Sequence, residues 1–191
     1  MKKKIALILA AAVAAGTLTG CGIVKVVPIG EEAAYSGKKT FDSAEESGND
    51  WAAVVEEISG AAVDVAEALK GDGVGDGLAV SGKGEIVEFN TDTPKYYLLV
   101  DVDGTEIKIQ AGGVYSGTAV RDVQTLKNFE SFTNQTEWSQ YGKALNKEVD
   151  AQVVAPLALD ESVAGKTVTF VGAAVESGGA VTVTPVSMTI E

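Results

Sequence analysis

Polar and aromatic side chains suited to binding chemistry are concentrated between residues 117 and 146. Arg121 and Asp122 can form an ion pair, and side-chain amides offer both hydrogen-bond donors and acceptors. Carbohydrate sites combine such fixed polar groups with the flat faces of aromatic rings. The candidate residues for a binding or structural motif are Thr118, Arg121, Asp122, Asn128, Phe129, Phe132, Asn134, Gln135 and Asn146.

The same residues could instead fix a crossover between a strand and a helix. Asn134 is followed three residues later by Glu137, a spacing typical of a capping pair at a helix N-terminus. Trp138 and Tyr141 lie at helical spacing, which is typical of rings that pack in a core. Both interpretations of the motif are open at the level of sequence.

The composition excludes most familiar catalytic chemistry. The chain has no histidine and a single cysteine, Cys21. Ser-His-Asp triads, histidine metal sites, zinc thiolates and thiol catalysis are therefore excluded. We expect no metal and no cofactor. An enzyme would depend on carboxylates such as Asp122 and Glu137, and a glycosidase needs two of them about 5–10 Å apart.

Residues 1–20 have the pattern of a bacterial lipoprotein signal peptide. Three lysines precede an apolar run, and Leu-Thr-Gly-Cys ends the segment, with cleavage expected between Gly20 and Cys21. Cys21 is the expected lipid attachment site. The sequence therefore predicts an extracytoplasmic protein anchored by lipid to the cell membrane, on the periplasmic side where an outer membrane exists.

The net charge restricts the partners of the chain. Loss of the three signal lysines takes the formal net charge from −12 to −15. A chain this acidic repels nucleic acid and anionic headgroups, so we expect no nucleic-acid partner. Membrane attachment would come from the acyl chains alone.

The segment that follows the signal divides into a tether and a helical region. Residues 21–47 have little hydrophobic periodicity and are expected to form the tether. Residues 48–77 carry an apolar stripe at helical spacing, capped by Asn49 or Asp50, and end in a glycine-rich linker. Gly60 is expected to divide this stripe into two short helices packed on the main domain.

Residues 78–191 predict a small β domain. Apolar residues alternate over three segments, a helix is expected near 134–149, and two further strands follow. Asp103-Gly104 and Ser177-Gly178-Gly179 are turn signals, and the alternation slips at Pro185, which predicts a bulge or an edge strand. The order β-β-β-α-β-β predicts an α+β, mainly β fold with an OB-like barrel. Another α+β sandwich is the alternative.

Three strings within the motif resemble the DUF2291 family of predicted periplasmic lipoproteins. They are GTAVRD at 117–122, FESFTNQ at 129–135 and ALN at 144–146. One departure is Gly112-Gly113, which stands where the family tends to have Gly-Pro. The resemblance implies an association with sugar-type ABC importers, with a sugar-binding protein or permease as partner.

The sequence favours a non-catalytic, lipid-anchored accessory or binding lipoprotein that could serve a sugar ABC import system. A small sugar is a further candidate partner. The alternative function is a carboxylate-dependent envelope enzyme such as a glycosidase.

Overall fold

The computed structural model describes residues 40–191, of which Asp42–Glu191 form a compact unit. The expected signal peptide, its cleavage site at Gly20 and Cys21, and most of the expected tether lie outside the described residues. Within residues 40–191, no helix has the length and apolar character needed to cross a membrane.

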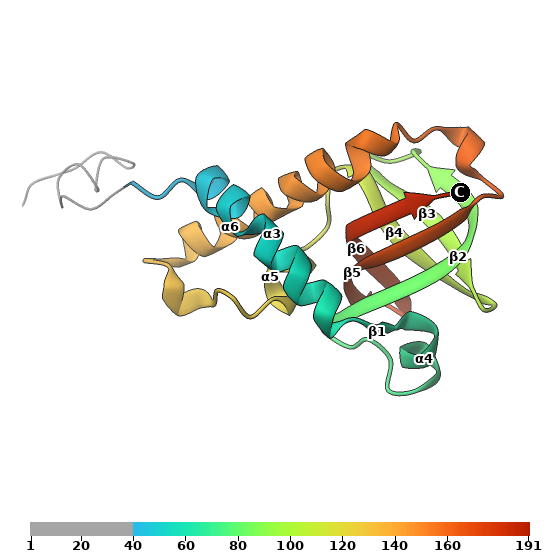
Figure 1. Ribbon diagram of the computed structural model, residues 1–191, viewed down its shortest axis with the longest axis horizontal. Coiled ribbons are helices and arrows are strands. Elements are labelled where there is room, and N and C mark those ends of the chain that lie inside the picture. The colour runs from blue at the N-terminus through green and yellow to red at the C-terminus, as the bar shows by residue number, and fades with distance from the viewer. Residues whose placement is uncertain (1–39) are drawn as a thin grey trace, which may run out of the picture. The chain divides into compact units, whose positions relative to one another are not determined.

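Five strands close into a barrel (Figure 1). They are β2 (Leu78–Asn90), β3 (Lys95–Val102), β4 (Thr105–Gly113), β5 (Thr167–Ser177) and β6 (Ala180–Ile190). Their order around the barrel is β2-β3-β4-β6-β5, and antiparallel pairing of β2 with β5 closes it. Only the contact between β4 and β6 is parallel among these five strands. The closed barrel confirms the predicted OB-like fold over the alternative α+β sandwich.

Local turn chemistry explains the two tight hairpins. Asp103 and Gly104, between β3 and β4, have φ values of +52° and +85°. Gly178 and Gly179, between β5 and β6, have φ values of +61° and +78°. Two consecutive positive φ values define the type I′ turn, which glycine and aspartate favour. Both turns were predicted, and both are confirmed.

Register shifts interrupt the alternation of side chains at three points of the barrel, one of them between Lys95 and Tyr97 in β3. The register of β5 and β6 shifts where Gly172 pairs with Pro185, which confirms the predicted irregularity. In β2 the register with β3 shifts between Ile86 and Glu88. Val87 lies at this shift and is 47% exposed.

The barrel interior is filled by apolar side chains from every strand. Ile86, Leu98, Ile107, Ile109 and Phe170 are each at most 1% exposed. Burial of one such side chain contributes roughly 1.5–3 kcal/mol. The interior is therefore a packed core, and any ligand site must lie on the outside or at an end of the barrel.

The N-terminal helix begins earlier than the sequence predicted. Helix α3 spans Ser43–Ala61, and the Asp42 carboxylate accepts hydrogen bonds from the backbone N–H of Ala44 and Glu45. The expected caps Asn49 and Asp50 lie inside the helix, and the tether boundary at residue 47 is wrong. The first turn of α3 carries few apolar residues, so periodicity gives no signal there.

Gly60 does not divide the helical region, contrary to the prediction. It lies within α3, and the break falls at Val63–Asp64, which form the short strand β1 parallel to β2. Asp64 then caps α4 (Val65–Lys70) by accepting from two backbone N–H groups. Strand pairing and the aspartate cap set the position of the break.

Helix α6 (Gln135–Val149) connects β4 to β5 together with shorter helical segments. It is preceded by α5 (Ala119–Val123) and continues into a π-helical turn (Asp150–Val154). Short 3-10 turns lie at Phe129–Ser131, Ala155–Leu157 and Glu161–Val163. Helix α6 packs against α3, side by side in Figure 1, and its predicted position near 134–149 agrees with the structure.

Candidate functional site

Arg121 and Asp122 lie on α5 and form a closed network with α6. The guanidinium Nε and Nη2 both donate to Asp122 Oδ1, at 2.8 and 2.6 Å. Asp122 Oδ2 accepts from the Thr118 hydroxyl at 2.7 Å. The Arg121 side chain is only 15% exposed, and its Nη1 donates to the Trp138 carbonyl. The polar groups of this part of the motif therefore engage one another.

Helix α5 packs closely against α6 at Gly142. A Cβ atom at Gly142 would lie 2.7 Å from Thr118 Cγ2 and 3.1 Å from Arg121 Cδ. The glycine thus leaves the space that Thr118 and Arg121 occupy on the surface of α6. This contact aligns the motif against the helix.

The asparagines of the motif form hydrogen bonds within the motif and at the N-terminus of α6. Asn128 exchanges hydrogen bonds with Ser131, and Asn134 Oδ1 accepts from the backbone N–H of Glu137 at 3.0 Å. Asn146 Nδ2 donates to the Gly117 carbonyl at 2.9 Å. Its Oδ1 is buried and has no partner within residues 40–191. Gln135 is exposed in the first turn of α6.

The aromatic residues of the motif have different environments. Phe132 packs against Trp138 and Tyr141, with ring centroids 5.2 and 5.1 Å apart. Phe129 is 51% exposed. The motif therefore presents one exposed ring rather than a continuous aromatic wall.

Contacts that the sequence did not predict join the crossover to α3. The Lys127 ammonium pairs with Glu46 and with Asp50 Oδ2, the latter at 2.6 Å. The Tyr141 hydroxyl donates to Asp50 at 2.9 Å, and Thr125 donates to Glu57 through its backbone N–H at 2.8 Å. These partners are 68 to 91 residues apart, and no local pattern indicates such pairs.

The contacts with α3 stabilise the protonated forms of Lys127 and Tyr141. Burial alone would lower the pKa of Lys127, but hydrogen bonds and charge from Asp50 and Glu46 outweigh it and raise the pKa above its usual value. Burial, followed by the hydrogen bond to Asp50, raises the pKa of Tyr141 well above its usual value. Both groups stay protonated at neutral pH.

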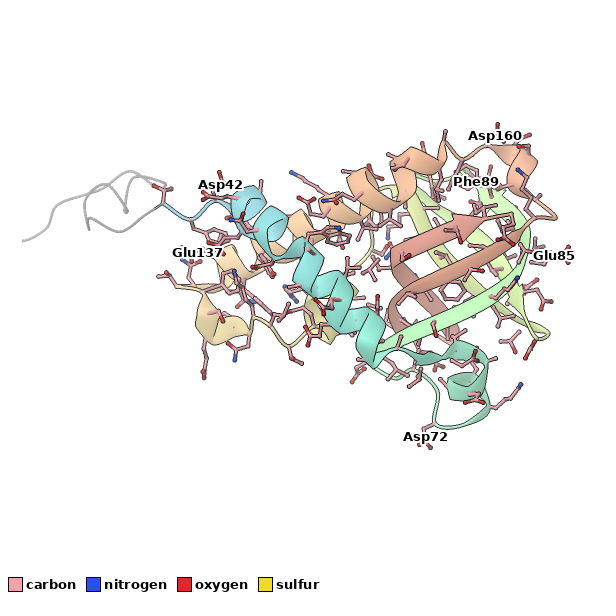
Figure 2. The ribbon with its side chains drawn as sticks, viewed as in Figure 1. Asp42, Asp72, Glu85, Phe89, Glu137 and Asp160 are labelled. Carbon is pink, nitrogen blue, oxygen red and sulfur yellow. The ribbon has the colours of Figure 1, made fainter. Side chains whose placement is uncertain are left out.

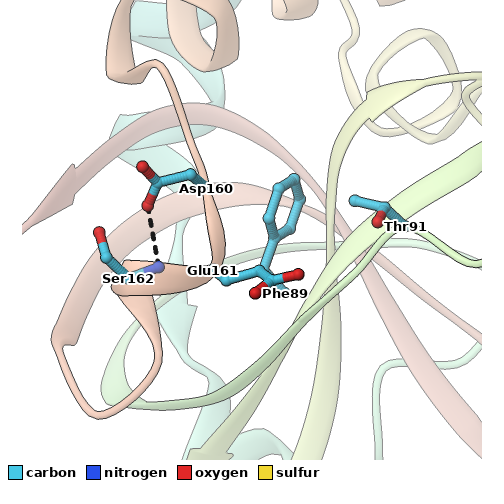
Figure 3. A pocket seen from close by; sticks show the side chains of 5 residues that line it. All are labelled: Phe89, Thr91, Asp160, Glu161 and Ser162. Atoms are coloured by element: carbon cyan, nitrogen blue, oxygen red, sulfur yellow. Dashed lines mark hydrogen bonds between the residues drawn. The ribbon is translucent and has the colours of Figure 1, made fainter.

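A groove lies at one end of the barrel, beside the loop between β2 and β3. One part has a volume of about 530 Å³ and is lined by Phe89, Thr91, Asp160, Glu161 and Ser162. Figure 3 shows the Phe89 ring between Thr91 and the turn in which Asp160 accepts from the Ser162 backbone N–H at 2.8 Å. Hydrogen bonding by Ser162, first through its side chain and then through its backbone N–H, lowers the pKa of Asp160, so its carboxylate is ionised at neutral pH.

A second part of the groove continues from the first. It has a volume of about 490 Å³ and shares Phe89 and Thr91 with its neighbour. Tyr96 meets Phe89 edge to face at 6.4 Å, and Asp150 adds a carboxylate. The groove thus combines aromatic faces, a hydroxyl and carboxylates.

The groove lies away from the part of the motif that is next to the start of α6. In Figure 2, Phe89 and Asp160 lie at the barrel end of the unit, whereas Glu137 lies at the opposite end of α6. Sequence reasoning selected the motif and missed Phe89, Tyr96, Asp150 and Asp160. Within residues 40–191, no three carboxylates or other ligating side chains gather to hold a metal ion.

The fold defines an OB-fold protein. A crystal structure of an OB-fold protein from Thermotoga maritima is similar, with a TM-score of 0.61 and 19% sequence identity. The match covers 80% of this chain and all of that one. No curated protein matches the chain.

The family model described as predicted periplasmic lipoprotein (DUF2291) matches residues 11–189. The chain therefore belongs to the DUF2291 family, which confirms the predicted membership. The description agrees with the expected extracytoplasmic location, and it indicates no enzymatic activity.

Proposed function

We propose that this protein is a non-catalytic, lipid-anchored binding lipoprotein that holds a small sugar in the groove at the barrel end. The observation that carries this proposal is the composition of the groove. Phe89 and Tyr96 offer apolar ring faces, while Thr91 and Asp150 offer hydrogen-bonding oxygens. Sugar rings have apolar faces and a periphery of hydroxyls, and such a mixed surface is complementary to both.

The engagement of the candidate carboxylates Asp122 and Glu137 supports a binding role over the glycosidase alternative. Asp122 accepts from Thr118 and Arg121, and Glu137 accepts from the backbone N–H of Thr133 at 2.9 Å. These engaged carboxylates offer no free acid and base pair. In the groove, the lowered pKa of Asp160 is the opposite of what a general acid needs.

An accessory role for a sugar ABC importer follows from the resemblance and from the proposed anchor at Cys21. A lipid-anchored protein remains at the membrane surface, where importers receive their substrates. The partner would be a periplasmic sugar-binding protein or the permease itself. The groove would then present or retain sugar beside that partner.

Thermal denaturation with a panel of pentoses and hexoses tests the binding role. At a sugar concentration ten times Kd, a ligand stabilises the folded state by about 1.4 kcal/mol. This raises Tm by roughly 3–5 °C for a domain of this size. The matched variants are Phe89→Ala in the groove and Phe129→Ala, an exposed ring outside it.

We expect at least one sugar to raise Tm, Phe89→Ala to remove the rise, and Phe129→Ala to retain it. Absence of any rise up to 100 mM sugar contradicts the proposal, as does equal binding by Phe89→Ala. Affinity capture from membranes with the lipidated protein tests the accessory role, and its expected product is a sugar-binding protein or permease identified by mass spectrometry.

A further inference from the structure

A further cavity, of about 380 Å³, lies between the chain that follows β4 and one face of α6. Val114 and Tyr115 form one wall, and Lys143, Asn146 and Lys147 form the other. Gly113 and Asp150 line both this cavity and the barrel-end groove. The cavity is therefore a lateral extension of the groove.

Asn146 lines this cavity and carries a buried acceptor without a partner. Asn146 is 8% exposed, and its Nδ2 is fixed by the Gly117 carbonyl. This bond determines which side of the amide is oxygen, so Oδ1 is an acceptor without a partner among residues 40–191. A buried acceptor without a donor costs about 1–3 kcal/mol, and a ligand hydroxyl would recover that cost if a shift of the Asn146 side chain exposed the oxygen to the cavity.

Two lysines give the cavity a positive rim. Lys143 and Lys147 are exposed, lie one helical turn apart, and make no ion pair with any carboxylate of residues 40–191. By contrast, Lys70, Arg121 and Lys127 each have a carboxylate partner. Among the lysines of residues 40–191 that make no ion pair, Lys143 and Lys147 are the two that line this cavity.

The remaining charged group in the cavity is Asp150. Its Oδ1 accepts from the Tyr115 hydroxyl at 3.2 Å. Burial, followed by the charge of Asp150, raises the pKa of Tyr115 well above its usual value, so the phenol stays a neutral donor. The cavity is thus lined by two cations and one carboxylate, and an unsatisfied amide oxygen is buried in its wall.

We propose that this cavity binds the charged end of a small hydroxylated anion, with Lys143 and Lys147 facing the charge and Asn146 Oδ1 accepting from a neighbouring hydroxyl. Sugar acids and sugar phosphates share this chemistry. The inference rests on the proposed function, because the uncharged part of such a ligand extends into the groove. The inference narrows the class of ligand from small sugars in general to sugars that carry a negative charge.

Titration calorimetry on the soluble form that lacks the lipid anchor tests the inference. The ligands are gluconate, galacturonate and glucose 6-phosphate, with glucose as the neutral comparison. Hexanoate matches gluconate in chain length and charge but has no hydroxyls, and inorganic phosphate has no sugar. The variants are Lys143→Gln/Lys147→Gln and the control Lys83→Gln, an exposed lysine on β2.

We expect at least one hydroxylated anion to bind ten times more tightly than glucose. The double variant should remove that preference, and Lys83→Gln should keep it. Preference for the sugar acids identifies a carboxylate ligand, and preference for glucose 6-phosphate identifies a phosphate ligand. Hexanoate and inorganic phosphate should bind at least ten times more weakly than the preferred ligand.

Three results would overturn the inference. Glucose could bind as tightly as the anions, the double variant could retain the preference, or hexanoate or phosphate could bind as well as the hydroxylated anions. Each of these leaves the proposed sugar-binding function intact when glucose itself binds in a Phe89-dependent way. Absence of binding by every ligand overturns the inference, and the thermal panel of pentoses and hexoses then decides the proposed function by itself.

Discussion

The guanidinium of Arg121 lies over the indole ring of Trp138, with its Cζ atom 4.4 Å from the ring centroid. The same guanidinium is bound by the carboxylate of the adjacent residue, Asp122. One face of the cation is therefore covered by an aromatic ring, and two of its nitrogens are held by one oxygen. Arg121 joins α5 to α6 and has little surface left for a ligand.

Replacement of Arg121 should destabilise the fold. We expect Arg121→Ala to lower the free energy of unfolding by about 1–3 kcal/mol, because a charge-assisted contact and a stacking contact are lost. Arg121→Lys should recover less than half of this, since an ammonium cannot reproduce the planar fork. Urea unfolding followed by tryptophan fluorescence measures both. An unchanged midpoint for Arg121→Ala would contradict the structural role.

Two glycine-to-alanine changes in helices should have opposite signs. Gly142→Ala places a Cβ 2.7 Å from Thr118 Cγ2, and we expect it to cost about 1–3 kcal/mol. Gly60→Ala meets no atom within 4 Å, and should stabilise by roughly 0.5–1 kcal/mol through helix propensity. Thermal and urea unfolding compare the pair. Stabilisation by both substitutions would disprove the close contact between α5 and α6.

Gln110 is a buried polar residue, next to the parallel contact of β4 and β6, whose side chain hydrogen-bonds to two other residues. Its Nε2 donates to Thr184 Oγ1 at 2.7 Å and to the Ser116 carbonyl, and its Oε1 accepts from the Ser116 N–H at 2.6 Å. Gln110→Leu should cost about 2–4 kcal/mol because these partners lose their bonds inside the protein. Urea unfolding measures the loss. Gln152→Leu, at an exposed position, is the control and should change stability by less than about 0.5 kcal/mol.

Alkaline pH should unfold the protein through Tyr141, Tyr115 and Lys127. Folding raises the pKa of both tyrosines, so above pH 10 the unfolded chain releases protons that the folded chain keeps. Stability should fall by up to about 1.4 kcal/mol per pH unit for each tyrosine. The raised pKa of Lys127 acts in the same direction, since its contribution is present below pH 10.5 and lost above it.

The variant Tyr141→Phe tests this linkage. It removes one of the titrating groups, so stability measured by urea unfolding between pH 9 and 11 should fall less steeply than in the parent. The effect at pH 7 should be a loss of about 1 kcal/mol from the missing hydrogen bond to Asp50. Equal slopes for parent and variant would show that Tyr141 ionises freely in the folded protein.

The barrel could be predicted because its signals are local. Alternation along β3 and β4 and the Asp103-Gly104 turn between them act over a few residues. The slip at Pro185 is also visible in the sequence, because proline cannot donate to a strand ladder. The order of strands and helix then restricts the topology, and the OB-like barrel follows.

The groove and the polar contacts with α3 could not be predicted, because residues that are far apart in the sequence form them. Phe89 ends a strand and Asp160 caps a turn that follows the helical crossover, and no spacing joins the two. The same holds for Asp50 and Tyr141, which meet across 91 residues. Sequence analysis selected the polar motif because its residue types are unusual, but it could not show that Arg121 and Asp122 would bind each other.

The parallel contact between β4 and β6 has a consequence for how the barrel forms and fluctuates. It rests on two register pairs, Lys108 with Thr182 and Ile109 with Val183, whereas β5 and β6 share ten. Its partners are also far apart in the chain, so the entropy of loop closure opposes its early formation. We expect this contact to form late in folding. We also expect its amide hydrogens to exchange with solvent sooner than those of the longer antiparallel contact between β5 and β6.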